Sequence, residues 1–370
     1  MQKRIIHAYN SYRMAKLKVA VIGLGRMGAE PSNRLTGKIP NGWLPISHVE
    51  AIQSTEGLDL VALCDNDTER LKTLSNHYGI NRTYLNSKHL IDEIHPDFLC
   101  IATRTLERSE IIQYACQNGV KVIYSEKPIS RSLFDCREIL DCVTNNNVVF
   151  GYGVNRRYHS VYRKAKKIIE SGELGELQEI VIESGVNSLF WTHPHSVDTI
   201  LFFADTTQID FIQGSCTFQN AYELTDPKLI DNDPIIDNAF FQFSNGVKAS
   251  INQVGGNNVR LACTKGILTI YSDGFHIEKI TGSSITPRYF NNVEIIKMES
   301  LMSATETAFK ELKEAVLFKK QIPITIQEIE TGMVMLLGII YSSLNDGKRI
   351  RPNDVPEDMI VTGRSGSLYA

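Results

Sequence analysis

Two segments, far apart in the sequence, carry the side chains best suited to chemistry. In the first, residues 21–28, an apolar strand runs into Gly-x-Gly-x-x-Gly. Bare glycine backbone can turn tightly there and approach a dinucleotide pyrophosphate at the N-terminus of a helix. The second, residues 125–128, places Lys127 just after another apolar strand. Because parallel strands present their carboxyl ends to ligands, we expect the first segment to hold a cofactor and the second to put an amine beside it.

The end of the second strand supplies a further cofactor residue. Asp65 is placed there to accept hydrogen bonds from the adenosine ribose, and a carboxylate repels a 2′-phosphate, so NAD is favoured over NADP. The alternative is a cap for a helix over residues 68–78, which fits Asp67 better than Asp65. The full set of expected cofactor-binding residues is Gly23, Gly25, Arg26, Met27, Gly28, Asp65, Thr103, Glu126 and Lys127.

Lys127 has two interpretations. A solvated surface lysine is the ordinary case. Here, however, the residue follows a buried strand and precedes Pro128, which fixes the backbone. A lysine at this place can hold the nicotinamide ribose and a substrate hydroxyl together, and its pKa would fall if it were desolvated.

A histidine segment, residues 190–203, supplies the expected base. Pro194 suits the first turn of a helix, so His195 lies where the macrodipole disfavours imidazolium. Asp198 lies on the same face and could orient the ring. His193 and His195 could instead be a structural pair or metal ligands, but no third ligand lies nearby and no metal site is expected. The expected catalytic residues are therefore Lys127 and His195.

The arrangement of apolar segments predicts an α/β protein with two domains. An N-terminal Rossmann domain, residues 14–152, has a doubly wound parallel sheet with strands at 18–22, 58–64, 97–102, 120–124 and 148–152, and helices at 68–78, 107–118 and 132–145. Residues 29–47 form an insertion beside the phosphate loop, because Asp65 follows the glycines at more than the usual spacing of about 20 residues. This Pro- and Gly-rich excursion is expected to cover the cofactor or wall the substrate cleft, and the alternative is a surface loop or subunit contact.

An α/β domain with a large, mostly antiparallel open sheet is expected over residues 153–350. Its strands are predicted at 177–183, 211–218, 240–243, 247–254, 260–264 and 268–271, with helices at 161–171, 304–319 and 326–344. Asn245-Gly246 indicates a hairpin turn. Residues 1–13 and 351–370 are expected to be terminal arms, and either Met1 or Met14 is the native start.

Composition limits the classes of partner. The net charge is -3 over 370 residues, so there is no electrostatic case for nucleic acid or an anionic membrane. No apolar run reaches the roughly 18 residues of a membrane span. Seven scattered cysteines without a Cys-x-x-Cys pair indicate a reduced, cytoplasmic setting.

Several of these segments together resemble the Gfo/Idh/MocA family of oxidoreductases, named for glucose-fructose oxidoreductase and inositol dehydrogenase. The resemblance is carried by residues 23–28, Glu126-Lys127-Pro128, 155–158, 172–176, His195-x-x-Asp198, 243–246, 264–266 and 345–347. It implies NAD(P)-dependent oxidation or reduction of sugars, cyclitols or related polyols. It also implies a homodimer or homotetramer formed through the open sheet. Three departures matter: Trp191 where many members carry an aspartate, residues 103–108 where Thr-Pro-Asn-x-x-His is usual, and the insertion.

The expected reaction is hydride transfer at a secondary carbinol, with His195 moving the hydroxyl proton and Lys127 binding the oxygen. The expected substrate contacts are Arg156, Arg157, Tyr158, Trp191, His193 and Asp198. Basic residues in this set, with Arg104, hint at an anionic sugar such as a nucleotide sugar, a sugar phosphate or a sugar acid. Two alternatives remain open: a non-redox sugar-processing enzyme with tightly held NAD, and a non-catalytic dinucleotide and sugar sensor.

Overall fold

The structure is a computed structural model, which describes residues 16–218, 228–282, 289–298 and 302–362. The expected N-terminal arm and the choice between Met1 and Met14 lie outside these ranges. Among the described residues, no helix is both long and apolar enough to cross a membrane.

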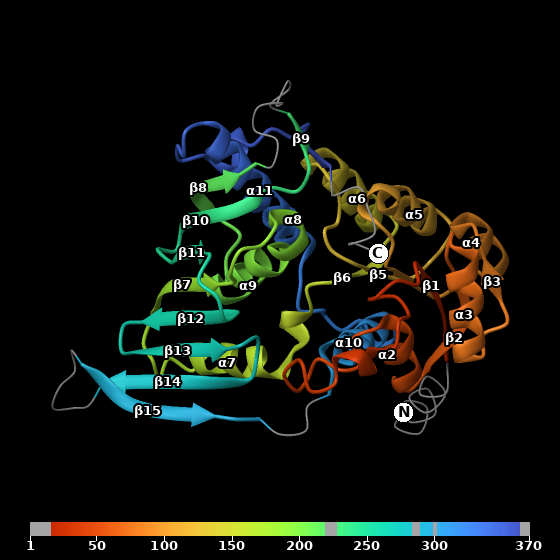
Figure 1. Cartoon of the computed structure of the whole chain (residues 1–370), viewed down its shortest axis with the longest axis horizontal. Coiled ribbons are helices and arrows are strands. Elements are labelled where there is room, and N and C mark those ends of the chain that lie inside the picture. Colours follow the sequence, from red (N-terminus) through yellow and green to blue (C-terminus); the bar gives the residue numbers. More distant parts are fainter. Residues whose placement is uncertain (1–15, 219–227, 283–288, 299–301, 363–370) are drawn as a thin grey trace, which may run out of the picture.

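A six-stranded parallel sheet forms the first half of the chain (Figure 1). Its spatial order is β3-β2-β1-β4-β5-β6. The strands are β1 (Leu17–Ile22), β2 (Leu58–Cys64), β3 (Thr83–Tyr84), β4 (Phe98–Ile101), β5 (Val122–Ser125) and β6 (Val149–Tyr152). The central strands are continuous apolar runs because both faces of the sheet are covered. The order reverses between β1 and β4, and ligands bind outside the strand ends at such a point.

Helices and one later segment cover this sheet. The helices are α2 (His48–Ser54), α3 (Thr68–Tyr78), α4 (Ser87–Ile94), α5 (Thr105–Gln117) and α6 (Leu133–Asn145). The sequence analysis missed α2, α4 and β3, which are short. From the end of the chain, α10 (Ala304–Phe318) returns to pack on β5, β6 and α2. Its fully buried Phe309 makes edge contacts with Phe98 and Tyr124, so this late helix completes the core of the first domain.

The helix that should follow the glycine loop is interrupted after one turn. Ala29 N donates to Gly25 O at 3.0 Å, and the chain then leaves through the short η1 (Ser32–Leu35). It returns at α2, where His48 N donates to Met27 O at 2.7 Å and Val49 N donates to Gly28 O at 3.0 Å. The insertion therefore interrupts a single helix: the glycine loop forms its first turn, and α2 continues it after the insertion.

The second sheet has eight strands in the order β15-β14-β13-β12-β7-β11-β10-β8. Only β7 and β11 pair in parallel, which confirms a mostly antiparallel sheet for the described residues. The strands are β7 (Leu177–Glu183), β8 (Ile209–Thr217), β10 (Ile235–Phe243), β11 (Lys248–Asn252), β12 (Asn258–Cys263), β13 (Gly266–Tyr271), β14 (His276–Gly282) and β15 (Phe290–Ile296). The Asn245-Gly246 turn joins β10 to β11, with Gly246 at φ 89°.

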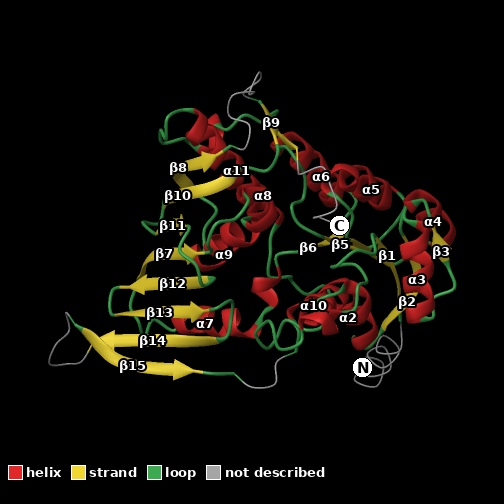
Figure 2. Cartoon of the chain, in the orientation of Figure 1, coloured by secondary structure: helices red, strands yellow, loops and turns green. Residues whose placement is uncertain are grey.

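Within the described ranges, helices lie on only one face of this sheet (Figure 2). They include α7 (Ser160–Glu170), α9 (Pro194–Ala204) and α11 (Ile326–Leu344), while η2 (Asn155–Tyr158) and α8 (Leu189–Thr192) connect them to the rest of the domain. Along β7, Ile180 and Ile182 are buried under these helices, whereas Val181 points to the opposite face and is only half-buried. The alternation confirms the predicted open sheet.

The C-terminal segment corrects one expectation. Residues 351–362 are not a free arm: they form η4 (Pro352–Asp354) and β16 (Ile360–Thr362), which pairs with β9 (Leu229–Asp231). Val361 N also donates to Arg131 O at 3.0 Å, which brings this segment back to the first domain. A three-residue strand gives little periodicity, so the sequence pattern did not indicate it. Residues 363–370 lie outside the described ranges.

Candidate active site

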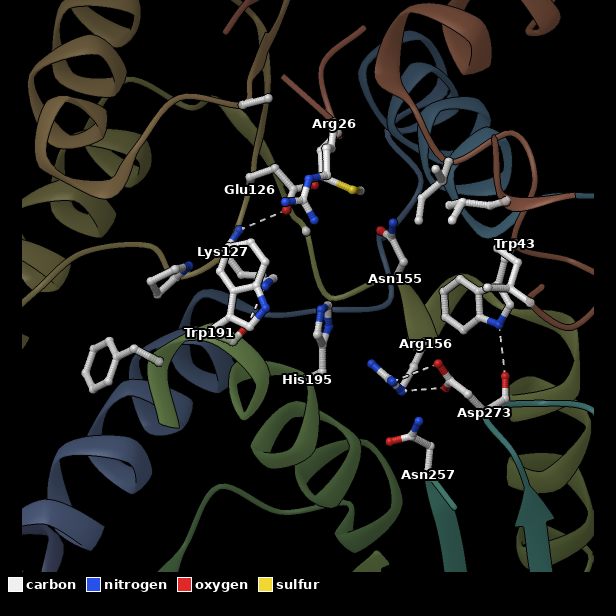
Figure 3. Close-up of a pocket in the computed structure, with 18 of the residues that line it drawn as sticks. Arg26, Trp43, Glu126, Lys127, Asn155, Arg156, Trp191, His195, Asn257 and Asp273 are labelled. Atoms are coloured by element: carbon white, nitrogen blue, oxygen red, sulfur yellow. Dashed lines mark hydrogen bonds and ion pairs between the residues drawn. The ribbon is translucent and has the colours of Figure 1, made fainter. Parts of the chain in front are cut away.

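A cleft of about 1460 Å³ separates the two domains and gathers half of the predicted site residues (Figure 3). Its walls come from the ends of β1, β4 and β5, from the insertion, and from the second domain. Small-molecule pockets are typically about 300–1,000 Å³, so this cleft has room for part of a dinucleotide and a substrate together. Of the predicted residues, those that line it are Arg26, Met27, Thr103, Glu126, Lys127, Arg156, Trp191 and His195.

The glycine loop fits a dinucleotide because two of its glycines tolerate no side chain. Gly23 has φ 87°, and a Cβ there would lie 2.6 Å from the carbonyl carbon of Ala102. A Cβ on Gly28 would lie 1.8 Å from the carbonyl oxygen of Gly23. The loop therefore packs as tightly as a phosphate-binding turn requires, and Arg26 and Met27 project from it into the cleft. These residues would hold the pyrophosphate.

Asp65 ends β2 as predicted, and its buried carboxylate faces the glycine loop. Its Oδ2 accepts from Leu24 N at 2.7 Å, and its Oδ1 accepts from Asp67 N at 2.9 Å. The Nη1 of Arg70 lies 3.5 Å from Oδ1. The helix-cap alternative is confirmed for Asp67, whose side chain accepts from Arg70 N at the start of α3. The ribose contact of Asp65 stays a prediction.

Glu126 is a buried carboxylate at the floor of the cleft. His48 Nε2 lies 3.2 Å from its Oε1. Burial alone would raise the pKa of Glu126, but the hydrogen bond and charge of His48, together with Lys127, hold it below its usual range. Sequence analysis missed His48, because it lies beyond the insertion and becomes a neighbour of Glu126 only when α2 stacks on the glycine turn.

Arg108 is a second residue that sequence analysis missed. It projects from α5, is almost fully buried, and donates to the carbonyl oxygens of Thr103 and Pro128. These two acceptors follow β4 and β5, so one guanidinium joins the loops that carry Thr103 and Lys127. Burial lowers the pKa of Arg108 to about 10, which still leaves it charged at neutral pH.

Lys127 reaches across the cleft to the second domain. Its Nζ donates to the carbonyl oxygen of Trp191 and lies 4.2 Å from the centre of the indole ring. Burial lowers the pKa of Lys127 to about 8, although Glu126 opposes the shift. The solvated-surface alternative does not describe this half-buried side chain.

His195 lies on the opposite wall, as the second residue of α9. The helix begins at Pro194, as predicted. Burial, with the positive charges of Arg156 and Lys127, lowers the pKa of His195 well below its usual value. The imidazole is therefore neutral near pH 7 and able to accept a proton.

The expected orientation of His195 by Asp198 is corrected. The Oδ1 of Asp198 is bound to Arg157 Nε at 2.6 Å, and the Nδ1 of His195 has no partner within the described residues. Asp198 turns away because Arg157 is buried beneath α9 and needs a counter-ion there. Glu328 contributes a second carboxylate to Arg157 at 2.7 Å.

Four of the predicted substrate contacts therefore lie behind the cleft wall. Arg157, Tyr158, His193 and Asp198 are all buried and do not line the cavity. In η2, successive side chains point in different directions, so Arg156 faces the cleft while Arg157 enters the core. The ring of His193 instead approaches Ser196, with Nδ1 3.1 Å from the hydroxyl oxygen.

The structure adds Asp233, just before β10, to the cleft. Its two carboxylate oxygens accept from Phe190 N at 2.7 Å and Trp191 N at 2.8 Å. Asp233 thereby caps α8, whose Trp191 carbonyl contacts Lys127. No spacing motif could have indicated this residue, because 42 positions separate it from Trp191.

Comparison with known proteins shows that the first domain matches a family model. Residues 17–154 match the Gfo/Idh/MocA model, an oxidoreductase family with an NAD-binding Rossmann fold. A myo-inositol 2-dehydrogenase of Thermotoga maritima is 26% identical over 168 residues, which is 45% of either chain. A D-apiose dehydrogenase of Rhizobium rhizogenes is 27% identical over 135 residues, 36% of this chain and 39% of that one. The matched segment spans less than half the length of these relatives.

Solved structures share the whole fold. A levoglucosan dehydrogenase in complex with NADH and L-sorbose superposes with a TM-score of 0.72 at 15% identity, covering 93% of this chain and all of that one (100%). A myo-inositol 2-dehydrogenase from Lactobacillus plantarum gives a TM-score of 0.67 at 22% identity, covering 92% and 100%. At these identities the likeness establishes the two-domain architecture and leaves activity to be argued from the site.

Proposed function

We propose that this chain, whose residues 17–154 match the Gfo/Idh/MocA oxidoreductase model, is an NAD-dependent dehydrogenase acting on a secondary carbinol of a sugar, a sugar derivative or a cyclitol. The observation that carries the proposal is the placement of Lys127 and His195 on opposite walls of one cleft. Inositol and apiose dehydrogenases among the relatives support this class of substrate.

Each residue has a role that follows from its environment. When bound, a nicotinamide would supply the acceptor for the hydride of the carbinol carbon in the oxidative direction. Neutral His195 takes the hydroxyl proton, and Lys127 donates a hydrogen bond to the oxygen as it becomes a carbonyl. In the reverse direction His195 returns the proton. Thr103, Glu126 and the glycine loop would hold the cofactor, and Trp191 and Arg156 would contact the substrate.

Asp65 supports NAD rather than NADP, since its carboxylate would repel a 2′-phosphate. We also propose that the chain assembles as a homodimer or homotetramer through the open face of the second sheet, where helices leave β7 and β10 uncovered.

The experiment is a screen of sugars, sugar acids, sugar phosphates, nucleotide sugars and cyclitols with NAD⁺ and NADP⁺, followed by absorbance of the reduced cofactor. A double variant, Lys127→Ala with His195→Ala, is the matched control for contaminating dehydrogenases. We expect at least one substrate that the wild-type chain oxidises and the control does not. Conversion of a sugar without net NADH formation, by protein that retains NAD through purification, would contradict the proposal and identify the non-redox alternative.

A further inference from the structure

Arg156 is held in a fixed orientation at the edge of the cleft. Its Nε and Nη2 each lie 2.9 Å from a carboxylate oxygen of Asp273, so the pair is bidentate. The hydroxyl of Tyr162 lies 3.2 Å from Nε and is itself bound to Asp273 at 2.8 Å. A guanidinium fixed along one edge loses little further freedom when its other edge binds a ligand.

The remaining edge of Arg156 is directed at the reaction site. Nη1 makes no hydrogen bond within the described residues, and in Figure 3 the end of the guanidinium away from Asp273 points toward His195. The positive charge is close enough to His195 to be a principal cause, after burial, of the lowered pKa of that ring. Nη1 and Nη2 together present the fork of donors that matches a carboxylate or a phosphate.

The insertion holds this arrangement in place. The indole Nε1 of Trp43 donates to the carbonyl oxygen of Asp273 at 2.9 Å, and its ring lies 5.7 Å from the Arg156 guanidinium carbon. The neighbouring Asn41 O lies 3.0 Å from His159 Nε2, and the imidazole of His159 packs on Trp43 with ring centres 4.6 Å apart. The insertion thus crosses from the first domain to fix the turn that carries Asp273.

The charge of the whole cleft favours an anion. Nine of its lining residues are Lys or Arg and three are Asp or Glu, although the chain as a whole has a net charge of -3. The three acids are already engaged: Asp273 by Arg156, Asp233 by two backbone amides, and Glu126 by His48. The pyrophosphate of a bound dinucleotide would neutralise only part of this excess of positive charge.

On the premise of the dehydrogenase proposed above, we propose that the substrate carries an anionic group, a carboxylate or a phosphate, close to the reacting carbinol, and that Arg156 binds it. The reaction itself is unchanged: hydride leaves the carbinol carbon for the cofactor and the hydroxyl proton goes to His195. Arg156 thereby sets which carbon of the substrate lies between Lys127 and His195.

The test compares matched substrate pairs that differ in charge: D-gluconate with D-glucitol, D-glucuronate with D-glucose, and D-glucose 6-phosphate with D-glucose. We expect kcat/KM to favour the anionic member of at least one pair by about tenfold or more. Arg156→Gln should lower kcat/KM for that anionic member on the order of 10- to 100-fold more than it lowers kcat/KM for the neutral member. Lys164→Gln removes an exposed positive charge outside the cleft and is the matched control.

Two further measurements keep the test decisive. Should Arg156→Gln misfold because Asp273 loses its partner, Arg156→Gln with Asp273→Asn removes both charges together. Calorimetry on the NADH-loaded wild-type chain needs no variant and should show binding of the anionic member only. Equal use of both members, or equal loss of both in Arg156→Gln, would overturn the anionic substrate while leaving the dehydrogenase intact. Binding of the anion without NAD⁺ reduction by any compound would instead overturn the dehydrogenase.

Discussion

Lys127 already points its ammonium group at an oxygen acceptor in the structure. In the structure its Nζ donates to the Trp191 carbonyl, which is an acceptor of the same chemical kind as a substrate alkoxide or carbonyl. A lysine ammonium has three donors, so a substrate oxygen can join this acceptor rather than displace it. His195, in contrast, is kept neutral, and so able to accept a proton, because burial and the charges of Arg156 and Lys127 lower its pKa.

Removing either side chain tests these roles. We expect Lys127→Ala and His195→Ala each to lower kcat on the order of 100-fold or more, because both act on the reacting oxygen. The dissociation constant for NADH, measured by calorimetry, should change little. His193→Ala, whose ring is buried against Ser196, is the control and should be milder. Near-normal turnover in either of the first two variants would show that the assigned chemistry is wrong.

The pH dependence of kcat/KM should follow Lys127 on its alkaline side. Burial lowers the pKa of Lys127 from 10.5 to about 8, so the ammonium is lost as pH rises through about 8. Because the cation is the hydrogen-bond donor, activity should fall there. Lys127→Arg keeps a charge at higher pH, and whatever activity it retains should lack this alkaline limb. The lowered pKa of His195 keeps that base neutral, so activity should stay level between about pH 6 and 7. A rate that keeps rising above pH 9 would contradict the donor role.

Asp65 should set the cofactor preference. We expect NAD(H) to bind at least tenfold more tightly than NADP(H), about 1.4 kcal/mol, because the buried carboxylate would repel a 2′-phosphate. Asp65→Ser should narrow this ratio, with the nearby Arg70 then left to attract the phosphate. Since Asp65 also binds Leu24 N, the melting temperature must be followed in parallel. Asp67→Ser removes a carboxylate from the helix cap only and is the control. Equal affinities in the wild-type chain would refute the assignment.

At the scale of elements, the insertion explains where sequence reasoning succeeded and failed. The spacing from Gly23 to Asp65 indicated an extra segment, and the structure lines the cleft with part of it. The spacing could not reveal that α2 resumes the interrupted helix, because this depends on backbone hydrogen bonds between His48 and Met27. The same limit hid the contact of His48 with Glu126.

Contacts between residues far apart in the sequence explain most other differences between the predicted and the observed structure. The spacing of apolar residues predicted the bounds of α3 and α11 correctly, because each helix has its own caps and its own buried face. It could not choose between Arg156 and Arg157, which are adjacent and chemically alike. Only the packing of α9 on η2, together with the ion pairs of Arg157 with Asp198 and Glu328, decides that Arg157 enters the core and Arg156 faces the cleft.

The fluorescence of Trp43 can report whether the insertion lies beside the bound cofactor. In a Trp191→Phe background, Trp43 is the remaining indole, and it lines the cleft. NADH should therefore quench its emission strongly by energy transfer as the cofactor saturates. The matched control is Trp43→Phe, which reports Trp191 alone. Unchanged Trp43 emission at saturating NADH would place the cofactor away from the insertion.

At the scale of the whole molecule, the uncovered sheet face distinguishes the second domain from an ordinary two-layer structure. Helices cover the face that carries Ile180, Ile182 and Phe241, whereas Val181 and Phe240 lie half-buried on the other. Two-fold dimers are the commonest soluble oligomers, and an uncovered sheet face suits them because the same surface then serves both partners.

We therefore expect sedimentation to show a species of two or four times 41.6 kDa. Val181→Glu with Phe240→Glu should shift the population to the monomer, because a paired interface would bury four unpaired carboxylates. Leu85→Glu changes an exposed residue of the first domain and is the matched control. Lys127 and His195 both come from one copy, so the monomeric variant should still bind NADH. A wild-type chain that sediments as a monomer at micromolar concentration would contradict the assembly.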